Sequence, residues 1–103
     1  MPPRMLIVRG PTYWSQKDES VFFEWLQSIS CVGKIGGRLR SLHISLKRAP
    51  SDSQLRELIA LFQRYRMNMK CLAALKTTRN VVWFDDKKMF WHARVFGQNR
   101  PRK

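Results

Sequence analysis

Hydrophobic positions in the first third of the chain follow the period of an α-helix. They fall at i, i+1, i+4, i+5 and i+8, and they are Val21, Phe22, Trp25, Leu26 and Ile29. Ser15 comes before this stripe, followed by Asp18 and Glu19, so a hydroxyl can cap free N–H groups while carboxylates face the positive end of the helix dipole. The pattern predicts a helix over 16–29 with its apolar stripe toward the core.

A second helical pattern follows in the middle of the chain. Its apolar positions fall at i, i+3, i+4, i+7 and i+10, and they are Leu55, Leu58, Ile59, Phe62 and Tyr65. Ser51 and Gln54 precede the stripe at the spacing of a capping box. This pattern predicts a helix over 52–66, with Arg64 on its outer face and Arg66 at its end, where a cation is favourable beside exposed carbonyls.

Other segments favour β-structure. Residues 5–8 are apolar and predict a short strand that ends before Pro11, which lacks the N–H that a ladder needs. Along 39–47, leucine and isoleucine alternate with serine, histidine and lysine, which is typical of a strand with one face in water. Residues 31–35 are expected to be its hairpin partner, with Gly36-Gly37 as the two-residue turn.

Together these elements predict one domain. A chain of 103 residues is long enough to bury one hydrophobic core and too short for two domains. Helical stripes and a one-sided sheet bury their apolar faces against each other, so we expect a single α+β domain over 1–97, with a small, mainly antiparallel sheet and helices packed on one face. Residues 98–103 are expected to form a basic tail.

Two segments of the last third admit alternatives. Residues 71–75 fit either a short helix or a buried strand. Residues 80–97 fit either a β-hairpin or a helix over 86–96 that Asp85 caps and Gly97 ends. The helix is the favoured alternative.

Within 80–97, we expect two tryptophans in different surroundings. Trp83 is assigned to the core, whereas Trp91 is expected to be partly exposed. The reason is that the charged residues of 85–88 and 92–94 must reach water on the side where Trp91 lies.

The charge of the chain indicates an anionic partner. Twenty Lys and Arg residues outnumber seven Asp and Glu, the net charge is +13, and both halves of the chain are basic. Such a potential attracts polyanions, so nucleic acid is the leading partner and an acidic protein is the alternative. No apolar run is long enough for a signal peptide or a transmembrane segment, and we expect a cytoplasmic protein.

Basic and aromatic residues alternate in the pattern that nucleic-acid binding needs, because cations neutralise phosphates and aromatic rings stack on bases. The residues expected to contact the partner are Arg9, Trp14, Lys47, Lys87, Lys88, Trp91, His92, Arg94, Arg100 and Arg102. The leading hypothesis is therefore a non-enzymatic binding module.

A small ribonuclease is a second alternative. Only His43 and His92 carry imidazoles, and such a pair beside cations could move the two protons of RNA cleavage. Asp85-Asp86 is interpreted as a turn or cap rather than a metal site. Cys31 and Cys71 are expected to be buried free thiols, and no cofactor, metal site or catalytic residue is assigned.

Aromatic residues also recur in short segments over most of the chain: Trp14-Ser15, Phe22-Phe23-Glu24-Trp25-Leu26, Trp83-Phe84-Asp85, Phe90-Trp91 and Val95-Phe96-Gly97. In this spacing the chain resembles small uncharacterised bacterial proteins of mobile elements, namely integron cassette products and toxin-immunity proteins. The resemblance implies a protein that neutralises a toxin. Many immunity proteins are acidic, so the charge of +13 departs from that pattern and implies a toxin with an acidic face.

Overall fold

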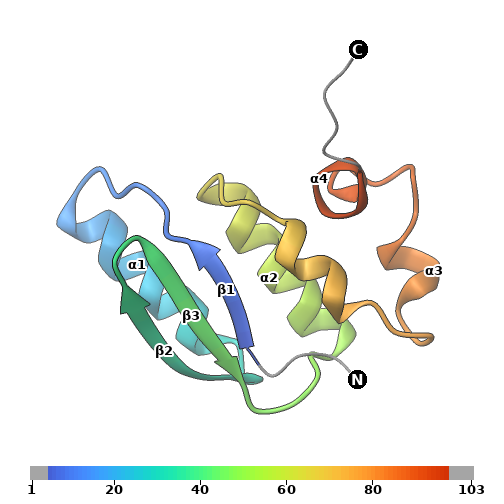
Figure 1. Ribbon diagram of the computed structural model, residues 1–103, viewed down its shortest axis with the longest axis horizontal. Helices are drawn as coiled ribbons and strands as arrows, with labels where there is room; N and C mark the ends of the chain where they lie inside the picture. Colours follow the sequence, from blue (N-terminus) through green and yellow to red (C-terminus); the bar gives the residue numbers. More distant parts are fainter. Residues whose placement is uncertain (1–4, 98–103) are drawn as a thin grey trace.

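Three strands form one antiparallel sheet in the computed structural model, which describes residues 5–97. They are β1 (Met5–Arg9), β2 (Val32–Arg38) and β3 (Ser41–Leu46), in the order β1-β3-β2 (Figure 1). Leu6 lies opposite Ile44 and Val8 opposite Leu42, and all four are buried. Side chains alternate between buried and more exposed along β1 and β3, so one face of the sheet belongs to the core.

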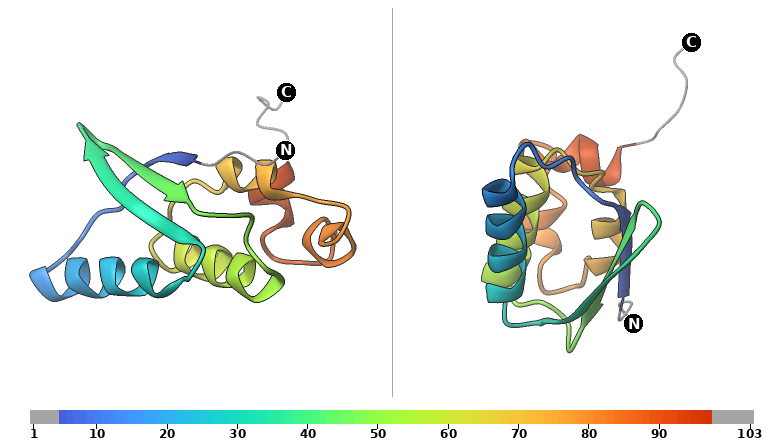
Figure 2. Two further views of the ribbon diagram at one scale, coloured as in Figure 1. Left: turned by 90° about the horizontal axis from the view of Figure 1, so that it is seen from below. Right: turned by 90° about the vertical axis from the view of Figure 1, so that its left-hand side faces the viewer.

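Two long helices cover that face (Figure 2). They are α1 (Gln16–Ser28) and α2 (Asp52–Arg64), each within two residues of the sequence prediction. The Ser15 hydroxyl accepts the Asp18 backbone N–H at 3.0 Å, and Ser51 with Gln54 completes a capping box at the start of α2. The predicted α+β fold is confirmed.

The core lies between the sheet and the helices. Its largest fully buried side chains include Phe22, Leu26, Ile44, Leu58, Phe62 and Phe84. These come from α1, β3, α2 and the last third of the chain, so one hydrophobic cluster joins every layer. The molecule is flattened, with dimensions of 36 × 36 × 21 Å.

The β2–β3 hairpin turns three residues later than the sequence predicts. Its two-residue loop is Leu39-Arg40, because Arg38 pairs with Ser41, whereas Gly36 and Gly37 lie inside β2. A turn at the glycines would set Val32 and Ile35 opposite polar residues. The observed register instead sets Val32 opposite Leu46 and Ile35 opposite Ile44 on the buried face, and this gain decides the pairing.

A β-bulge makes that register possible. Val32 and Ile35 are three positions apart, so a regular strand would point them to opposite faces. The pairing shifts by one residue between them, at Gly33 and Lys34, and both apolar side chains then face the core.

The last third of the chain forms three short helices. Residues 70–75 are a 3-10 helix, η1 (Lys70–Leu75), which resolves the first open alternative as a helix. The expected hairpin or single helix over 80–97 is wrong, because the chain forms α3 (Val81–Phe84) and α4 (His92–Phe96), joined by turns. Gly97 ends α4 as predicted.

Trp91 is held inside the fold by contacts with α3. Its indole N–H donates to the Phe84 carbonyl at 2.8 Å, and the ring stands edge-on to Trp83. The chain folds back at 85–90 to bury this ring, so Trp91 is only 6% exposed and Trp83 is half-buried. The expectation that Trp91 is partly exposed is therefore wrong, because a buried hydrogen bond holds it inside. Trp83 packs against the core but is only partly buried.

Candidate functional site

A cleft of about 910 Å³ opens between the β1–α1 connection and the end of α2. We call it the arginine cleft. Its lining residues include Arg9, Thr12, Trp14, Asp18, Arg64 and Arg66. Three arginine residues therefore line one cavity, and the described residues that line it include a single acidic residue, Asp18. This charge balance suits an anionic ligand.

Trp14 is the exposed aromatic residue of the arginine cleft. Its side chain is 86% exposed, although the backbone around it is well fixed: the Trp14 N–H donates to the Asp18 carboxylate at 3.0 Å. An apolar residue in this position, just before a helix cap, commonly packs on the fourth residue of the helix. Here that residue is the charged Glu19, so Trp14 has no apolar partner on the first turn of α1.

Arg64 and Arg66 reach the arginine cleft because α2 ends in a Schellman motif. The Met67 N–H bonds to the Phe62 carbonyl at 2.8 Å, and the Arg66 N–H bonds to the Gln63 carbonyl at 3.2 Å. Arg66 has φ of 57° in a position that glycine usually takes. The fold tolerates a disfavoured backbone here and gains an exposed arginine at the rim of the cleft.

The carboxylate of the arginine cleft is already engaged. Asp18 accepts the Trp14 N–H, and its backbone carbonyl accepts the Tyr65 hydroxyl at 3.2 Å. Burial and then the charge of Asp18 raise the pKa of Tyr65, so this hydroxyl stays protonated and continues to donate. Asp18 thus links the β1–α1 connection, through Trp14, to the end of α2, through Tyr65.

A smaller cleft of about 460 Å³ lies on the other side of the β1–α1 connection. We call it the hairpin cleft, since Leu39 and Arg40 of the β2–β3 loop line it together with Tyr13. Both clefts share residues 9–12 as a wall. The Gly10 N–H donates to the Arg40 carbonyl at 2.8 Å, so the wall is bonded directly to the hairpin.

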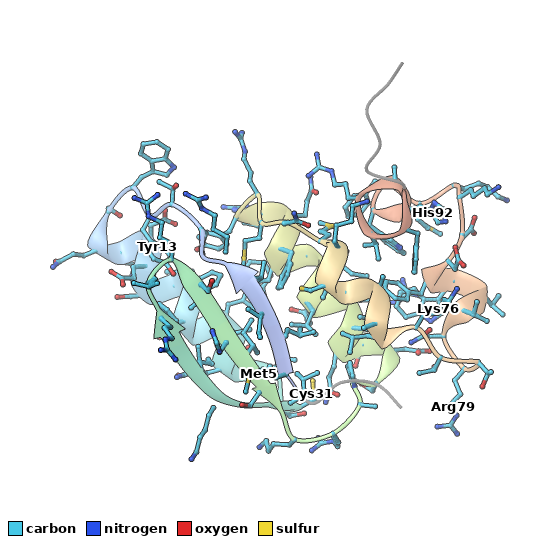
Figure 3. The ribbon with its side chains drawn as sticks, viewed as in Figure 1. Met5, Tyr13, Cys31, Lys76, Arg79 and His92 are labelled. Atoms are coloured by element: carbon cyan, nitrogen blue, oxygen red, sulfur yellow. The ribbon has the colours of Figure 1, made fainter. Side chains whose placement is uncertain are left out.

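Of the residues that the sequence predicts as a binding site, the structure brings Arg9 and Trp14 together. Lys87, Lys88, His92 and Arg94 lie at the opposite end of the molecule, around α3 and α4. Figure 3 shows this separation, with Tyr13 near α1 and both Lys76 and His92 at the far end. Lys47 is exposed after β3, and Arg100 and Arg102 fall outside the described residues.

At that far end, a carboxylate joins three segments. Asp85 accepts hydrogen bonds from His92 at 2.7 Å and from Lys76 at 3.1 Å. These two hydrogen bonds, His92 first, hold the pKa of Asp85 below its ordinary value. Asp85 links η1, α3 and α4 rather than capping a helix over 86–96, as the sequence suggested.

The two imidazoles of the ribonuclease hypothesis are not brought together. His43 lies in β3, opposite Ile7 and Gly36, whereas α4 with His92 lies beyond β1 and η1 (Figure 1). Cys31 and Cys71 are free thiols, Cys31 buried and Cys71 half-buried. Burial raises the pKa of both, that of Cys71 to about 11, so neither is an activated nucleophile.

Sequence reasoning missed Arg40, Arg64 and Arg66. The helical pattern explained Arg64 and Arg66 as an outer face and a helix end, and no local signal placed them beside Arg9. Only the packing of α2 beneath the β1–α1 connection makes the cleft. The sequence does contain a signal for the exposure of Trp14. A tryptophan that precedes a helix cap and has no apolar residue on the first helical turn has no local partner to bury it.

Within residues 5–97, no helix has both the length and the hydropathy to cross a membrane. Over the same range, His, Cys, Asp and Glu form no group of three that could hold a metal ion. No family model, curated protein or solved structure matches the chain.

Proposed function

We propose that this protein is a nucleic-acid binding module, and that the arginine cleft is where it binds unpaired bases and their phosphates. The observation that carries the proposal is Trp14, an indole 86% exposed at the edge of a cavity bordered by three arginines. Arg9, Arg64 and Arg66 neutralise backbone phosphates, and Trp14 stacks on a base.

The position of Trp14 supports stacking. An indole that stays in water contributes none of the stabilisation that burial of its apolar surface would give. An exposed tryptophan therefore adds nothing to the stability of the fold, and binding is the use that explains it. Its backbone is fixed by Asp18 before any ligand arrives, so binding costs less conformational entropy than it would for a residue in a free loop.

The charge of the arginine cleft supports the same ligand. Its acidic residue, Asp18, accepts a hydrogen bond from Trp14, and Arg9, Arg64 and Arg66 are all exposed. Guanidinium groups bind phosphate oxygens with paired N–H donors, a geometry suited to a sugar-phosphate backbone.

The first prediction concerns Trp14. Trp14→Ala should weaken binding of a fluorescently labelled single-stranded oligonucleotide by about 5- to 150-fold, equivalent to the loss of about 1–3 kcal/mol of base stacking. The melting temperature should stay close to that of the wild type, because the ring is not packed. Fluorescence anisotropy titration at low salt and a thermal melt measure the two effects.

Phe90→Ala is the matched control. Phe90 is another exposed aromatic residue, 59% exposed, and it lies among the basic residues near α4. This variant should bind like the wild type. If Phe90→Ala weakens binding and Trp14→Ala does not, the far end of the molecule is the interface instead. Absence of binding to DNA and RNA strands at about 50 mM salt would contradict the proposal, and an acidic protein partner would then be the better hypothesis.

A further inference from the structure

The β2–β3 hairpin ends in an apolar residue that touches almost nothing. Leu39 is 99% exposed, and Arg38 and Arg40 flank it. In Figure 2 the end of the hairpin stands clear of α1 and α2. We call residues 38–40 the hairpin tip.

Leu39 is costly in this position. Its φ is 58°, in the region that glycine adopts freely and that a side chain with a Cβ resists. Type II′ hairpin turns favour glycine at this first loop position for the same reason. Because Leu39 makes no compensating contact with the core, folding alone does not explain its side chain.

The two arginines of the hairpin tip lie on opposite sides of it. Arg38 pairs with Ser41, whose side chain belongs to the outer face of the sheet, away from the helices. Arg40 lines the hairpin cleft on the inner side, and Arg38 does not. The tip thus presents an apolar point with one cation on each flank.

The outer flank leads to the arginine cleft. Arg9 pairs with Ser41 on one side of β3 and Arg38 pairs with it on the other, so the side chains of Arg9 and Arg38 belong to the same outer face. A strand that passes Arg38 therefore meets Arg9 next, and Arg9 and Trp14 both line the arginine cleft.

From this arrangement we propose that the preferred ligand is a forked nucleic acid, in which two unpaired strands leave a duplex. This inference rests on the proposed function and names the form of its ligand. Leu39 covers the last base pair of the duplex, Arg38 and Arg40 bind the phosphates of the two departing strands, and the strand beside Arg38 continues past Arg9 to the arginine cleft. Apolar side chains placed against base steps elsewhere act in the same physical way, by replacing a stacked base.

The test compares three ligands of shared sequence: a forked duplex, the blunt duplex and the single strand, each titrated against the full chain at one salt concentration. The wild type should bind the fork about tenfold more tightly than either other ligand, the size of one stacking contact. Leu39→Gly should abolish this preference while single-strand affinity stays unchanged. Its melting temperature should equal or exceed that of the wild type, because glycine relieves the positive φ.

Leu39→Met is the matched control, since it keeps an apolar tip and should retain the preference for the fork. Equal preference in the wild type and Leu39→Gly would overturn the inference, as would equal binding of fork and single strand by the wild type. In both cases single-strand binding that depends on Trp14 would leave the proposed function standing. No binding to any of the three ligands would overturn both.

Discussion

The surroundings of a tryptophan, rather than the residue type, determine whether its ring is free to bind. Trp14 and Trp91 both lie among basic residues in the sequence, yet they are 86% and 6% exposed. The difference comes from hydrogen bonding, because the Trp91 indole reaches the Phe84 carbonyl and Trp14 has a backbone bond only. A charge pattern along the chain does not contain this information.

The second prediction follows for Trp91. Trp91→Ala should destabilise the fold by about 3–5 kcal/mol, because it leaves a cavity beside Trp83 and removes the hydrogen-bond donor of a buried carbonyl. Urea unfolding measures the loss, with Trp14→Ala as the variant that should unfold like the wild type. A Trp91→Ala protein of normal stability would show that the ring contributes little to the core.

At the scale of elements, the sequence predicted the helices and strands whose structure depends on residues close together in the sequence. The helices over α1 and α2 follow from their stripes and from caps at Ser15 and Ser51, because a cap satisfies backbone groups within one turn. The hairpin was predicted but not its turn, since the register depends on which side chains of β3 are buried. The region of α3 and α4 was missed because a side-chain bond across the turns between the two helices, from Trp91 to Phe84, is not part of any local helix or hairpin pattern.

Asp85 shows how such a region is held, and the third prediction concerns it. Because its pKa is lowered in the folded state, the carboxylate stabilises the protein above its ordinary value of 3.8, and this contribution is lost as the pH falls through the lower pKa of the folded state. Asp85→Asn should therefore unfold at a lower urea concentration than the wild type at neutral pH. The two should converge as the pH falls below 3.8.

Glu24→Gln is the control for that pH series. Glu24 is an exposed carboxyl on α1, and its replacement should leave the urea midpoint nearly unchanged at each pH. A gap between Asp85→Asn and the wild type that stays constant down to acid pH would mean that the charge of Asp85, in its hydrogen bonds with His92 and Lys76, does not stabilise the fold.

At the scale of the molecule, positive charge gathers at both ends. One end holds the arginine cleft and the hairpin tip, and the other holds Lys87, Lys88 and Arg94 near α4. Charge and aromatic pattern predicted a basic protein and placed Arg9 and Trp14 among ten candidate binding residues. They did not show which cations share a surface, because Arg9 and Arg64 are separated by more than half the chain and meet only after α2 packs.

The fourth prediction uses this division. For a single strand, a plot of log affinity against log salt concentration has a negative slope, and its magnitude decreases by about 0.7 for every phosphate that the protein no longer neutralises. Arg9→Gln, Arg64→Gln and Arg66→Gln combined should therefore lower that magnitude by about 2. Lys87→Gln, Lys88→Gln and Arg94→Gln remove the same charge from the other end and should change it little. Equal changes from both triple variants would indicate attraction to net charge without a defined site.

For the proposed function, the flattened shape of the molecule would set how closely copies can follow one another along one face of a nucleic acid. Its long dimension is 36 Å, and one helical turn of a duplex measures about 34–36 Å. A single copy lying along a duplex would therefore span about one turn of the face that it covers. Both ends of that copy are cationic, so neighbours one turn apart repel each other at low salt, and a short ligand is expected to take one protein rather than an array.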